Sequence, residues 1–206
     1  MIKWGLVVEG FGETAAFPAL LGRVLRASSI TDIELLPPVR KHRSELLSHD
    51  GLEKVVKWLR IYKGADGAII ILLDANSDLP CLVAPERKDW CEGPAAGVPV
   101  SYVMAKSEFE TWFLGAIESL RGTRGIRGDA ESPLEPESIR DAKLALTHLM
   151  EKSRVYSPTA DQEYLAARFD YEMARTRCPS LDKLLRDIEG IIATSSVQTT
   201  SPHVLD

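Results

Sequence analysis

The sequence has few cysteines, no long apolar run and no strong net charge, and each absence removes a class of protein. Its three cysteines, Cys81, Cys91 and Cys178, form no Cys-x-x-Cys pair and have no matching histidine spacing. This pattern speaks against a zinc site and is typical of reduced structural thiols. The apolar run from Ala68 to Leu73 is far shorter than the roughly 20 residues that a membrane helix needs.

Signals for export and for repeats are also lacking. The chain begins with a strand-like segment rather than a signal peptide, so we expect no membrane association and a cytoplasmic location. The net charge of −5 argues against a wholly basic nucleic-acid module, and any such role must rest on local clusters. The Ser/Thr-rich end, residues 193–206, is expected to be a flexible tail.

The order of strand and helix patterns predicts an α/β protein with one Rossmann-like core. Four strand-like runs alternate with helical runs, which predicts a mostly parallel sheet of about four strands flanked by helices. The expected strands are Lys3 to Val8, Ile33 to Val39, Gly67 to Leu73 and Val98 to Ala105. We expect residues 1–128 to form this core and residues 129–192 to form a helical extension packed on it.

Prolines shape two of these expectations. Apolar positions from Phe17 to Leu25 keep helical spacing, and Pro18 is compatible with that helix if it lies in the first turn. Between the third and fourth strands, Pro80, Pro85 and Pro94 predict a loop rather than a helix.

Acidic residues stand where the predicted strands end. Glu9 follows the first strand, Asp74 follows the third, and Glu108 and Glu110 follow the fourth, while Glu13 opens the first helix. The carboxyl ends of parallel strands lie at one edge of a sheet, where ligands bind in open α/β folds. We therefore expect these carboxylates to converge on one pocket.

The segment from Asp74 to Asp78 presents oxygen ligands at alternate positions, which suits a hard cation. An EF-hand is excluded, because Leu79 replaces the required glycine and Pro85 stands where the bidentate glutamate belongs. A Mg²⁺ or Mn²⁺ ion shared with a substrate phosphate fits better. Such an ion takes one or two carboxylates and keeps several waters.

Each of these carboxylates also has a structural interpretation. Asp74 can be a turn residue, and Glu13 and Glu108 can interact favourably with the positive dipole ends of the helices that they begin. Ser107 and Glu110 have the spacing of a capping box. Several carboxylates brought close, however, raise one another's proton affinity unless a cation holds them, and a metal ion is the simplest resolution.

The turn after the first strand matches a second, looser pattern. Residues Gly10 to Ala15 fit the dinucleotide pattern G-x-G-x-x-A. Glu9 and Glu13 would place negative charge beside a pyrophosphate, which needs bare amides at the helix N-terminus. An NAD- or NADP-dependent enzyme therefore ranks below a metal-dependent one.

Positive charge is clustered in two places. The stretch 37–63 holds seven Lys or Arg residues against three acids, and Arg121, Arg124 and Arg127 lie in a later glycine-containing loop. Both clusters can contact a phosphate backbone, although a solvated helix face explains the first one equally well. Lys106, at the end of the fourth strand, is a candidate to stabilise a scissile phosphate.

Two of these features resemble a TOPRIM-type domain. In that family a glutamate ends the first strand, often within V-E-G-x-x-E, and an Asp-x-Asp ends the third strand. Here the first feature is V-V-E-G-F-G-E at residues 7–13, and the second begins with Asp74. Asn76 departs from the family by replacing the second aspartate, and Asp78 is the candidate for supplying its charge.

A closer resemblance is to an uncharacterised bacterial TOPRIM-like family that is described as a domain of unknown function. The chain is similar to it in the first turn, in S-E-F-E-T-W-F-L-G-A-I-E-S-L at residues 107–120, and in the helical region from residue 141. The resemblance implies the fold and an acidic metal site. Related TOPRIM domains of the OLD nuclease kind cut DNA with magnesium, usually beside an ATPase partner.

Together, residues and resemblance predict a magnesium-dependent phosphodiester hydrolase of the nuclease type, acting on nucleic acid and with an ATPase partner. Glu9, Asp74 and Asp78 would hold the ion, and Glu108 or Glu110 a second or outer-sphere ion. Glu13 would be a base or a further ligand. Lys106 and the loop of Arg121, Arg124 and Arg127 would offset developing charge. The alternative is a non-catalytic binding subunit of an ATPase or nucleic-acid complex.

Overall fold

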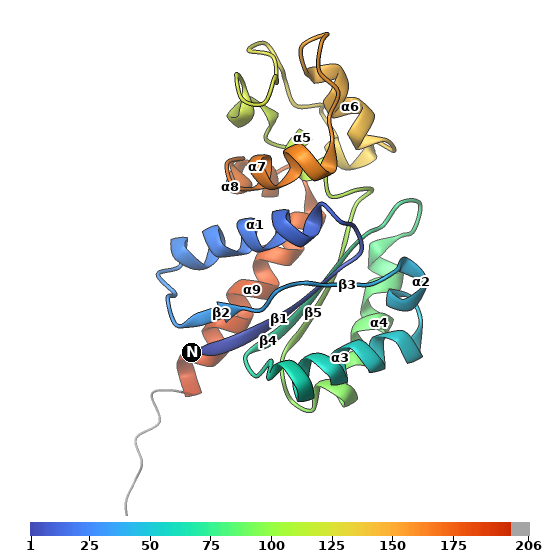
Figure 1. Ribbon diagram of the computed structural model, residues 1–206, viewed down its shortest axis with the longest axis vertical. Helices are drawn as coiled ribbons and strands as arrows, with labels where there is room; N and C mark the ends of the chain where they lie inside the picture. Colours follow the sequence, from blue (N-terminus) through green and yellow to red (C-terminus); the bar gives the residue numbers. More distant parts are fainter. Residues whose placement is uncertain (199–206) are drawn as a thin grey trace, which may run out of the picture.

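A single parallel sheet forms the centre of the protein in this computed structural model, which describes residues 1–198 (Figure 1). Its strands are β1 (Ile2–Val8), β2 (Ile33–Leu35), β3 (Val39–Arg40), β4 (Ala68–Asp74) and β5 (Val100–Ala105). The strand order is β2-β1-β4-β5, β3 also pairs with β1, and each of these pairings is parallel. The α/β class and the mostly parallel sheet are thus confirmed.

The sheet has five strands where about four were expected. The second predicted strand is divided into β2 and β3 by Pro37 and Pro38, which have no N–H group to donate to a sheet ladder. Both pieces run along β1, so the division leaves the sheet order unchanged.

Helices cover both faces of the sheet, and the alternation of side chains along the strands explains why both faces are apolar. On one face, α1 (Glu13–Ala27) and α9 (Pro179–Gln198) pack against residues such as Leu6 and Ile70. On the other, α3 (His49–Lys63) and α4 (Pro80–Ala95) pack against Val7 and Ile71, with the short α2 (Arg43–Leu46) beside them. A strand buried on both faces has a continuous apolar sequence, as β4 does.

Short helices continue the chain beyond the carboxyl ends of the strands, where Figure 1 places them above the sheet. They are α5 (Thr111–Leu114), η1 (Ile117–Leu120), η2 (Pro136–Ser138), α6 (Ala142–Leu149), η3 (Pro158–Gln162), α7 (Glu163–Ala166) and α8 (Tyr171–Arg175). Their buried side chains join those of α1 and α9 in one hydrophobic cluster. The helical region is therefore built onto the same face of the sheet that α1 and α9 cover.

The proline-based expectations were wrong in two places. Residues 80–95 form the helix α4, because Pro80 occupies a first-turn position and the later Pro85 and Pro94 are accommodated inside it. Pro18 lies inside α1 and beyond its first turn. In both helices the prolines are tolerated because packing against the sheet outweighs the loss of single backbone bonds.

The end of the chain is helical for longer than expected. The tail was predicted from residue 193, but α9 continues to Gln198. The rest of the predicted tail, residues 199–206, lies outside the described residues. In the part of the chain that the structure describes, no helix has the length and apolar character needed to cross a membrane.

Candidate metal centre

The acidic residues at the strand ends do meet at one edge of the sheet. β4 lies between β1 and β5, with Val8 beside Leu72 and Asp74 beside Ala105. Glu9 therefore leaves β1 next to the end of β4, and the segment carrying Glu108 and Glu110 leaves β5 on its other side. The convergence predicted from the parallel sheet follows from this strand order.

Three carboxylates form what we call the inner cluster: Glu13, Asp74 and Glu110. Gln162 links two of them, because its Nε2 donates to Glu13 Oε1 at 3.0 Å and lies 3.4 Å from Glu110 Oε1. Tyr156 donates its hydroxyl to the same Glu110 oxygen at 2.9 Å. Asp74 accepts the Phe109 amide at 2.8 Å. Glu110 is fully buried and Glu13 is 8% exposed, so these two acids are largely removed from water, and the side chain of Asp74 is 21% exposed.

The predicted capping box is absent, and this changes the interpretation of Glu110. Ser107 donates its hydroxyl to the carbonyl of Ile139 instead of capping a helix. The Glu110 side chain turns inward to Tyr156 and Gln162. The spacing of a serine and a glutamate was compatible with a cap, but burial of the glutamate beside Asp74 places it in the site.

Lys143, at the start of α6, lies among carboxylates from two strand ends. Its Nζ is 2.7 Å from Glu108 Oε1, 3.3 Å from Glu110 Oε2 and 3.8 Å from Asp74 Oδ2. Glu108 also accepts the backbone amides of Ala142 and Lys143, at 2.8 and 3.3 Å. Glu108 thus caps α6 and fixes Lys143 beside the inner cluster.

Glu9 and Asp78 form an outer pair held by one arginine. Arg43 Nη1 lies 3.5 Å from Glu9 Oε2, and Arg43 Nη2 donates to Asp78. The same guanidinium donates to the backbone carbonyls of Asp74 and Ala75. The outer pair therefore has its own counter-charge, supplied by α2.

Burial and mutual repulsion shift the proton affinities of the inner cluster. Desolvation raises the pKa of Asp74 well above its usual value, and the nearby Glu110 and Glu13 raise it further. Desolvation also raises the pKa of Glu110, against the opposing effects of Lys143 and Tyr156. Burial acts to lower the pKa of the Lys143 ammonium, but Glu110, Glu108 and Asp74 outweigh it and raise that pKa. The cluster therefore tends to bind a proton or another cation.

The glycine turn before α1 is shaped by this cluster. Glu13 Oε2 accepts the Gly10 amide at 2.5 Å. A Cβ atom on residue 12 would lie only 1.7 Å from Oε1 of Gln162. The glycines thus permit close packing of Glu13 and Gln162 against the turn, and the chain's own carboxylate occupies the place that a dinucleotide phosphate would need.

The predicted phosphate-binding residues lie outside the acidic cluster. Lys106 donates its ammonium to the Asp78 carbonyl at 2.9 Å. Arg121 donates to the Ala130 carbonyl, Arg124 stacks on the Tyr164 ring, and Arg127 pairs with Asp129 and donates to the carbonyl of His148.

Arg127 lies away from the acidic residues. It donates to the carbonyl of His148 near the end of α6, whereas Glu108 binds the start of that helix, so the two contacts are about 10 Å apart along it. Among the basic residues of the 37–63 stretch, Arg43 reaches the outer pair. Lys54 and Lys57 instead form i,i+4 pairs with Asp50 and Glu53 on the surface of α3.

Four residues of the site were not assigned a role from sequence reasoning: Arg43, Lys143, Tyr156 and Gln162. Arg43 was counted only as part of a basic stretch. The other three lie in the helical region, whose resemblance to the bacterial family covered them without indicating chemistry. No local spacing signals their position, because it depends on how that region packs over the strand ends.

The oxygen donors of the site fit an ion that binds one or two carboxylates and several waters, as Mg²⁺ does, better than an ion that needs a complete set of protein ligands. In residues 1–198, no three His, Cys, Asp or Glu side chains are arranged as a ready-made metal site. Magnesium is commonly held by one or two carboxylates with water completing its shell. Buried Gln162 Oε1 has no hydrogen-bond partner, and Glu110 Oε2 has only the ion pair with Lys143. Two cations, Arg43 and Lys143, form ion pairs with the carboxylates of the site. The site has a surplus of negative charge, because it holds six carboxylates: Glu9, Glu13, Asp74, Asp78, Glu108 and Glu110.

Comparison with known proteins gives one family. A family model described as a domain of unknown function (DUF4276) matches residues 8–189, a range that contains the acidic residues of the site together with Lys143, Tyr156 and Gln162. No curated protein and no solved structure gives a significant match.

Proposed function

The chain belongs to the family described as a domain of unknown function (DUF4276), and from the geometry of its site we propose that it is a magnesium-dependent phosphodiester hydrolase of the nuclease type. The observation that carries this proposal is the inner cluster. Glu13, Asp74 and Glu110 lie close enough to raise one another's proton affinity, and Lys143 is the cation that pairs with Asp74 and Glu110. A divalent cation at the carboxyl edge of a parallel sheet would satisfy them and would face the crevice where substrates bind.

In this proposal Asp74 and Glu110 hold Mg²⁺ or Mn²⁺, with Glu9 and Asp78 at the outer side. The bound ion would polarise the phosphate and lower the pKa of a water. Gln162 orients the Glu13 carboxylate, which is the candidate base for that water. Tyr156 fixes Glu110, and Lys143 reduces repulsion among Asp74, Glu108 and Glu110 so that they can remain close without a second ion.

Glu108 takes a smaller part here than the sequence predicted, because three donors from α6 already bind its carboxylate. Lys106 and the loop of Arg121, Arg124 and Arg127 remain candidates for contacts with a nucleic-acid backbone, outside the metal site. The resemblance to TOPRIM domains of the OLD nuclease kind supports an enzyme that works beside an ATPase partner, and a cytoplasmic location is part of the same proposal.

The direct test is cleavage of plasmid and single-stranded DNA in the presence of Mg²⁺ or Mn²⁺. Wild type should cut, whereas Glu9→Ala and Asp74→Asn should reduce the rate, Asp74→Asn the more strongly. Glu131→Gln, which changes an exposed acid, serves as the control and should match wild type. Equal rates for wild type and both site variants would remove the assignment.

A second candidate is a non-catalytic binding subunit that retains the fold and docks on an ATPase or on nucleic acid. The position of Lys143 favours it, because one ammonium already lies within 4 Å of Glu108, Glu110 and Asp74. Asn76, in the place of the second aspartate of Asp-x-Asp, points the same way. Calorimetric titration with Mg²⁺ and Mn²⁺ separates the two candidates, because a silent subunit has no need to bind either ion.

A further inference from the structure

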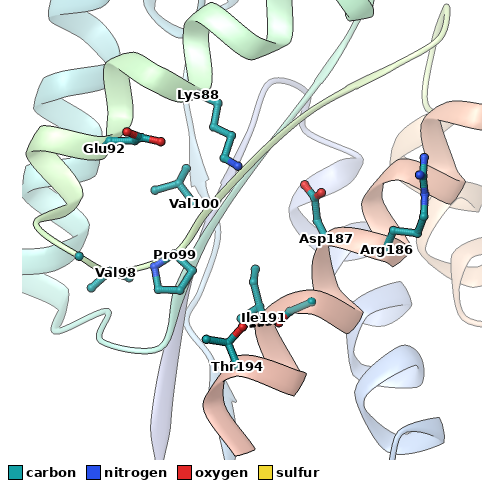
Figure 2. A pocket seen from close by; sticks show the side chains of 11 residues that line it. Lys88, Glu92, Val98, Pro99, Val100, Arg186, Asp187, Ile191 and Thr194 are labelled. Carbon is teal, nitrogen blue, oxygen red and sulfur yellow. Dashed lines mark hydrogen bonds between the residues drawn. The ribbon is translucent and has the colours of Figure 1, made fainter. Parts of the chain in front are cut away.

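A hollow of about 610 Å³ lies between α4 and α9, and Figure 2 shows the side chains that line it. It borders residues 97–100, at the start of β5, whereas the acidic residues gather where the strands end. In a parallel sheet these are opposite edges. Side chains that contact a substrate of the candidate metal centre must therefore lie elsewhere, at the acidic edge.

Phe11 lies at that edge, in the turn between β1 and α1. It is two residues from Glu9 and two from Glu13, so its Cα lies within about 7 Å of the Cα of each. Its side chain is 69% exposed. Its carbonyl accepts the amide and the hydroxyl of Thr14, at 3.3 and 2.6 Å, which fixes the backbone of the turn. An aromatic ring is thus held in solvent beside the acidic residues.

Arg40 lies against this ring. β3 pairs with β1 so that Arg40 stands beside Val8, the residue before Glu9. The guanidinium carbon is 4.0 Å from the centroid of the Phe11 ring, a distance at which an aromatic face attracts a cation. Within residues 1–198 the Arg40 side chain has no hydrogen bond and no ion pair. Its N–H donors are therefore available to an anion.

The strand order places this pair in line with the metal centre. β3 and β4 both pair with Val8, so they lie on opposite sides of β1. Along the edge of the sheet, Arg40 is therefore followed by Glu9 and then by Asp74. A chain of phosphates lying along this edge would pass from the free guanidinium to the carboxylates that we propose as metal ligands.

The ring and the guanidinium match the two parts of a nucleotide. Bases of single-stranded nucleic acid stack on exposed aromatic side chains, and this contact tolerates any sequence because every base has a flat face. A guanidinium donates to phosphate oxygens. A base inside a duplex already has neighbours on both faces, so Phe11 suits a base that is unpaired.

We propose that Phe11 stacks on an unpaired base of single-stranded nucleic acid and that Arg40 contacts a phosphate of the same strand. This inference rests on the proposed function, because it names single-stranded nucleic acid as the substrate of the metal centre. The base on Phe11 would set the position of the strand, so that a neighbouring phosphate lies at Asp74.

The test measures binding of the full chain to a short labelled oligothymidylate by fluorescence anisotropy, separately from cleavage. Binding is measured with Ca²⁺ in place of Mg²⁺ and again with EDTA, and a gel shows whether the DNA stays intact. Phe11→Ala should weaken binding at least about fivefold. Phe11→Leu, which is apolar but has no aromatic face, should lose as much, whereas Phe11→Trp should bind as tightly as wild type.

Leu134→Ala is the matched control for these variants, because Leu134 is another exposed apolar residue, 96% exposed, in the loop before η2. Its affinity should equal that of wild type. A duplex of the same length should bind equally to wild type and Phe11→Ala. An excess of unlabelled dTMP should compete far more weakly than the unlabelled oligonucleotide, because it lacks the neighbouring phosphates.

The salt dependence of binding separates the phosphate contact from the stacking contact. Arg40→Gln should reduce the slope of log affinity against log salt by about 0.7, the value for one phosphate contact of a single strand. Phe11→Ala should keep the slope of wild type. Lys152→Gln, at an exposed site in the helical region, should keep both the slope and the affinity.

Several results would overturn the proposal. The first is failure of the oligonucleotide to bind in both Ca²⁺ and EDTA, and the second is equal affinity of Phe11→Ala and Leu134→Ala. An equal loss of duplex binding in Phe11→Ala would exclude stacking on an unpaired base, and equal competition by dTMP would make a free nucleotide the ligand. If Phe11→Ala does not fold, as judged by thermal unfolding, equal affinity of Phe11→Leu and Phe11→Trp is sufficient to reject stacking.

The same experiments keep this inference apart from the proposed hydrolase activity. Binding that depends on Phe11, without cleavage in Mg²⁺ or Mn²⁺, would remove the hydrolase and retain the stacking contact. Cleavage of single-stranded DNA at equal rates by wild type and Phe11→Ala, with equal affinities, would retain the hydrolase and remove the stacking contact.

Discussion

The inner cluster and the outer pair carry the same chemical groups in different surroundings. Glu9 and Asp78 lie toward solvent, with side chains 26% and 37% exposed, and share the guanidinium of Arg43. Glu13 and Glu110 are buried and Asp74 is 21% exposed, and Lys143 is the cation shared by Asp74, Glu110 and Glu108. In the outer pair one guanidinium thus serves two carboxylates, whereas the single ammonium of Lys143 serves Asp74, Glu108 and Glu110 and no ion pair reaches Glu13 among the described residues. The inner cluster is left with a surplus of negative charge that a bound cation would relieve.

The largest expected effect comes from removing one carboxylate on each side of this comparison. Asp74→Asn keeps the shape of the side chain and an acceptor for the Phe109 amide but removes a charge from the inner cluster. We expect it to weaken Mn²⁺ binding by roughly 100-fold or more, about 2.7 kcal/mol. Asp78→Asn, in the outer pair, should weaken it by about tenfold, the lower end of the range seen for changes beside a metal site. Calorimetry provides both affinities, and similar losses in the two variants would erase the distinction between inner and outer acids.

A smaller effect is expected from removing the cation of the inner cluster. Lys143→Met keeps most of the side-chain length but leaves Glu108, Glu110 and Asp74 without their ammonium. In metal-free protein this should lower the free energy of unfolding by about 2 kcal/mol, less than for a fully buried pair because Lys143 is partly exposed. Mg²⁺ should restore part of the loss. Urea unfolding measures both quantities.

Lys152→Met is the matched control for that experiment, because Lys152 is exposed. Its stability should equal that of wild type with and without Mg²⁺. If Lys143→Met were as stable as this control, Lys143 would not be neutralising the cluster.

The smallest expected effect is on the pH dependence of stability. Asp74 and Glu110 have pKa values raised in the folded protein, so the folded chain binds more protons than the unfolded chain between the ordinary value near 4 and the raised value. Their contribution to stability is therefore fully present below about pH 4 and is lost as the pH rises through the raised pKa.

The difference between wild type and Asp74→Asn isolates this contribution from that of all other acids. Urea unfolding from about pH 4 to pH 8 should show a shallower decline, or a steeper rise, in the variant, since it lacks one of the two groups. Parallel pH profiles would indicate that Asp74 has an ordinary pKa. Such a result would also argue against the claim that the inner cluster binds a cation to offset its surplus negative charge.

What the sequence could and could not predict follows from the same comparison. The proximity of Glu9, Asp74 and Glu110 could be predicted from the sequence, because apolar strands alternating with helices predict a parallel sheet whose strands end at the same edge. Lys143, Tyr156 and Gln162 could not, since their positions depend on how short helices pack above the sheet. The capping-box spacing of Ser107 and Glu110 suggested a structural role for Glu110. Spacing alone does not show which way a side chain turns.

Local rules also failed where packing outweighs them. Three prolines suggested a loop for residues 80–94, yet α4 forms there and buries Ala84, Cys91 and Ala95 against the sheet. Sequence patterns thus predicted the sheet and its acidic edge, and the tertiary arrangement determined which cations lie beside the acids.

The most direct test of the central claim is calorimetric titration of the wild-type protein with MnCl₂ in two buffers that differ in heat of protonation. If the inner cluster lacks positive charge and holds a proton in its place, Mn²⁺ will bind and displace that proton, and the measured heat will differ between the buffers in proportion to the proton released. The absence of binding, or binding with the same heat in both buffers, would contradict the account.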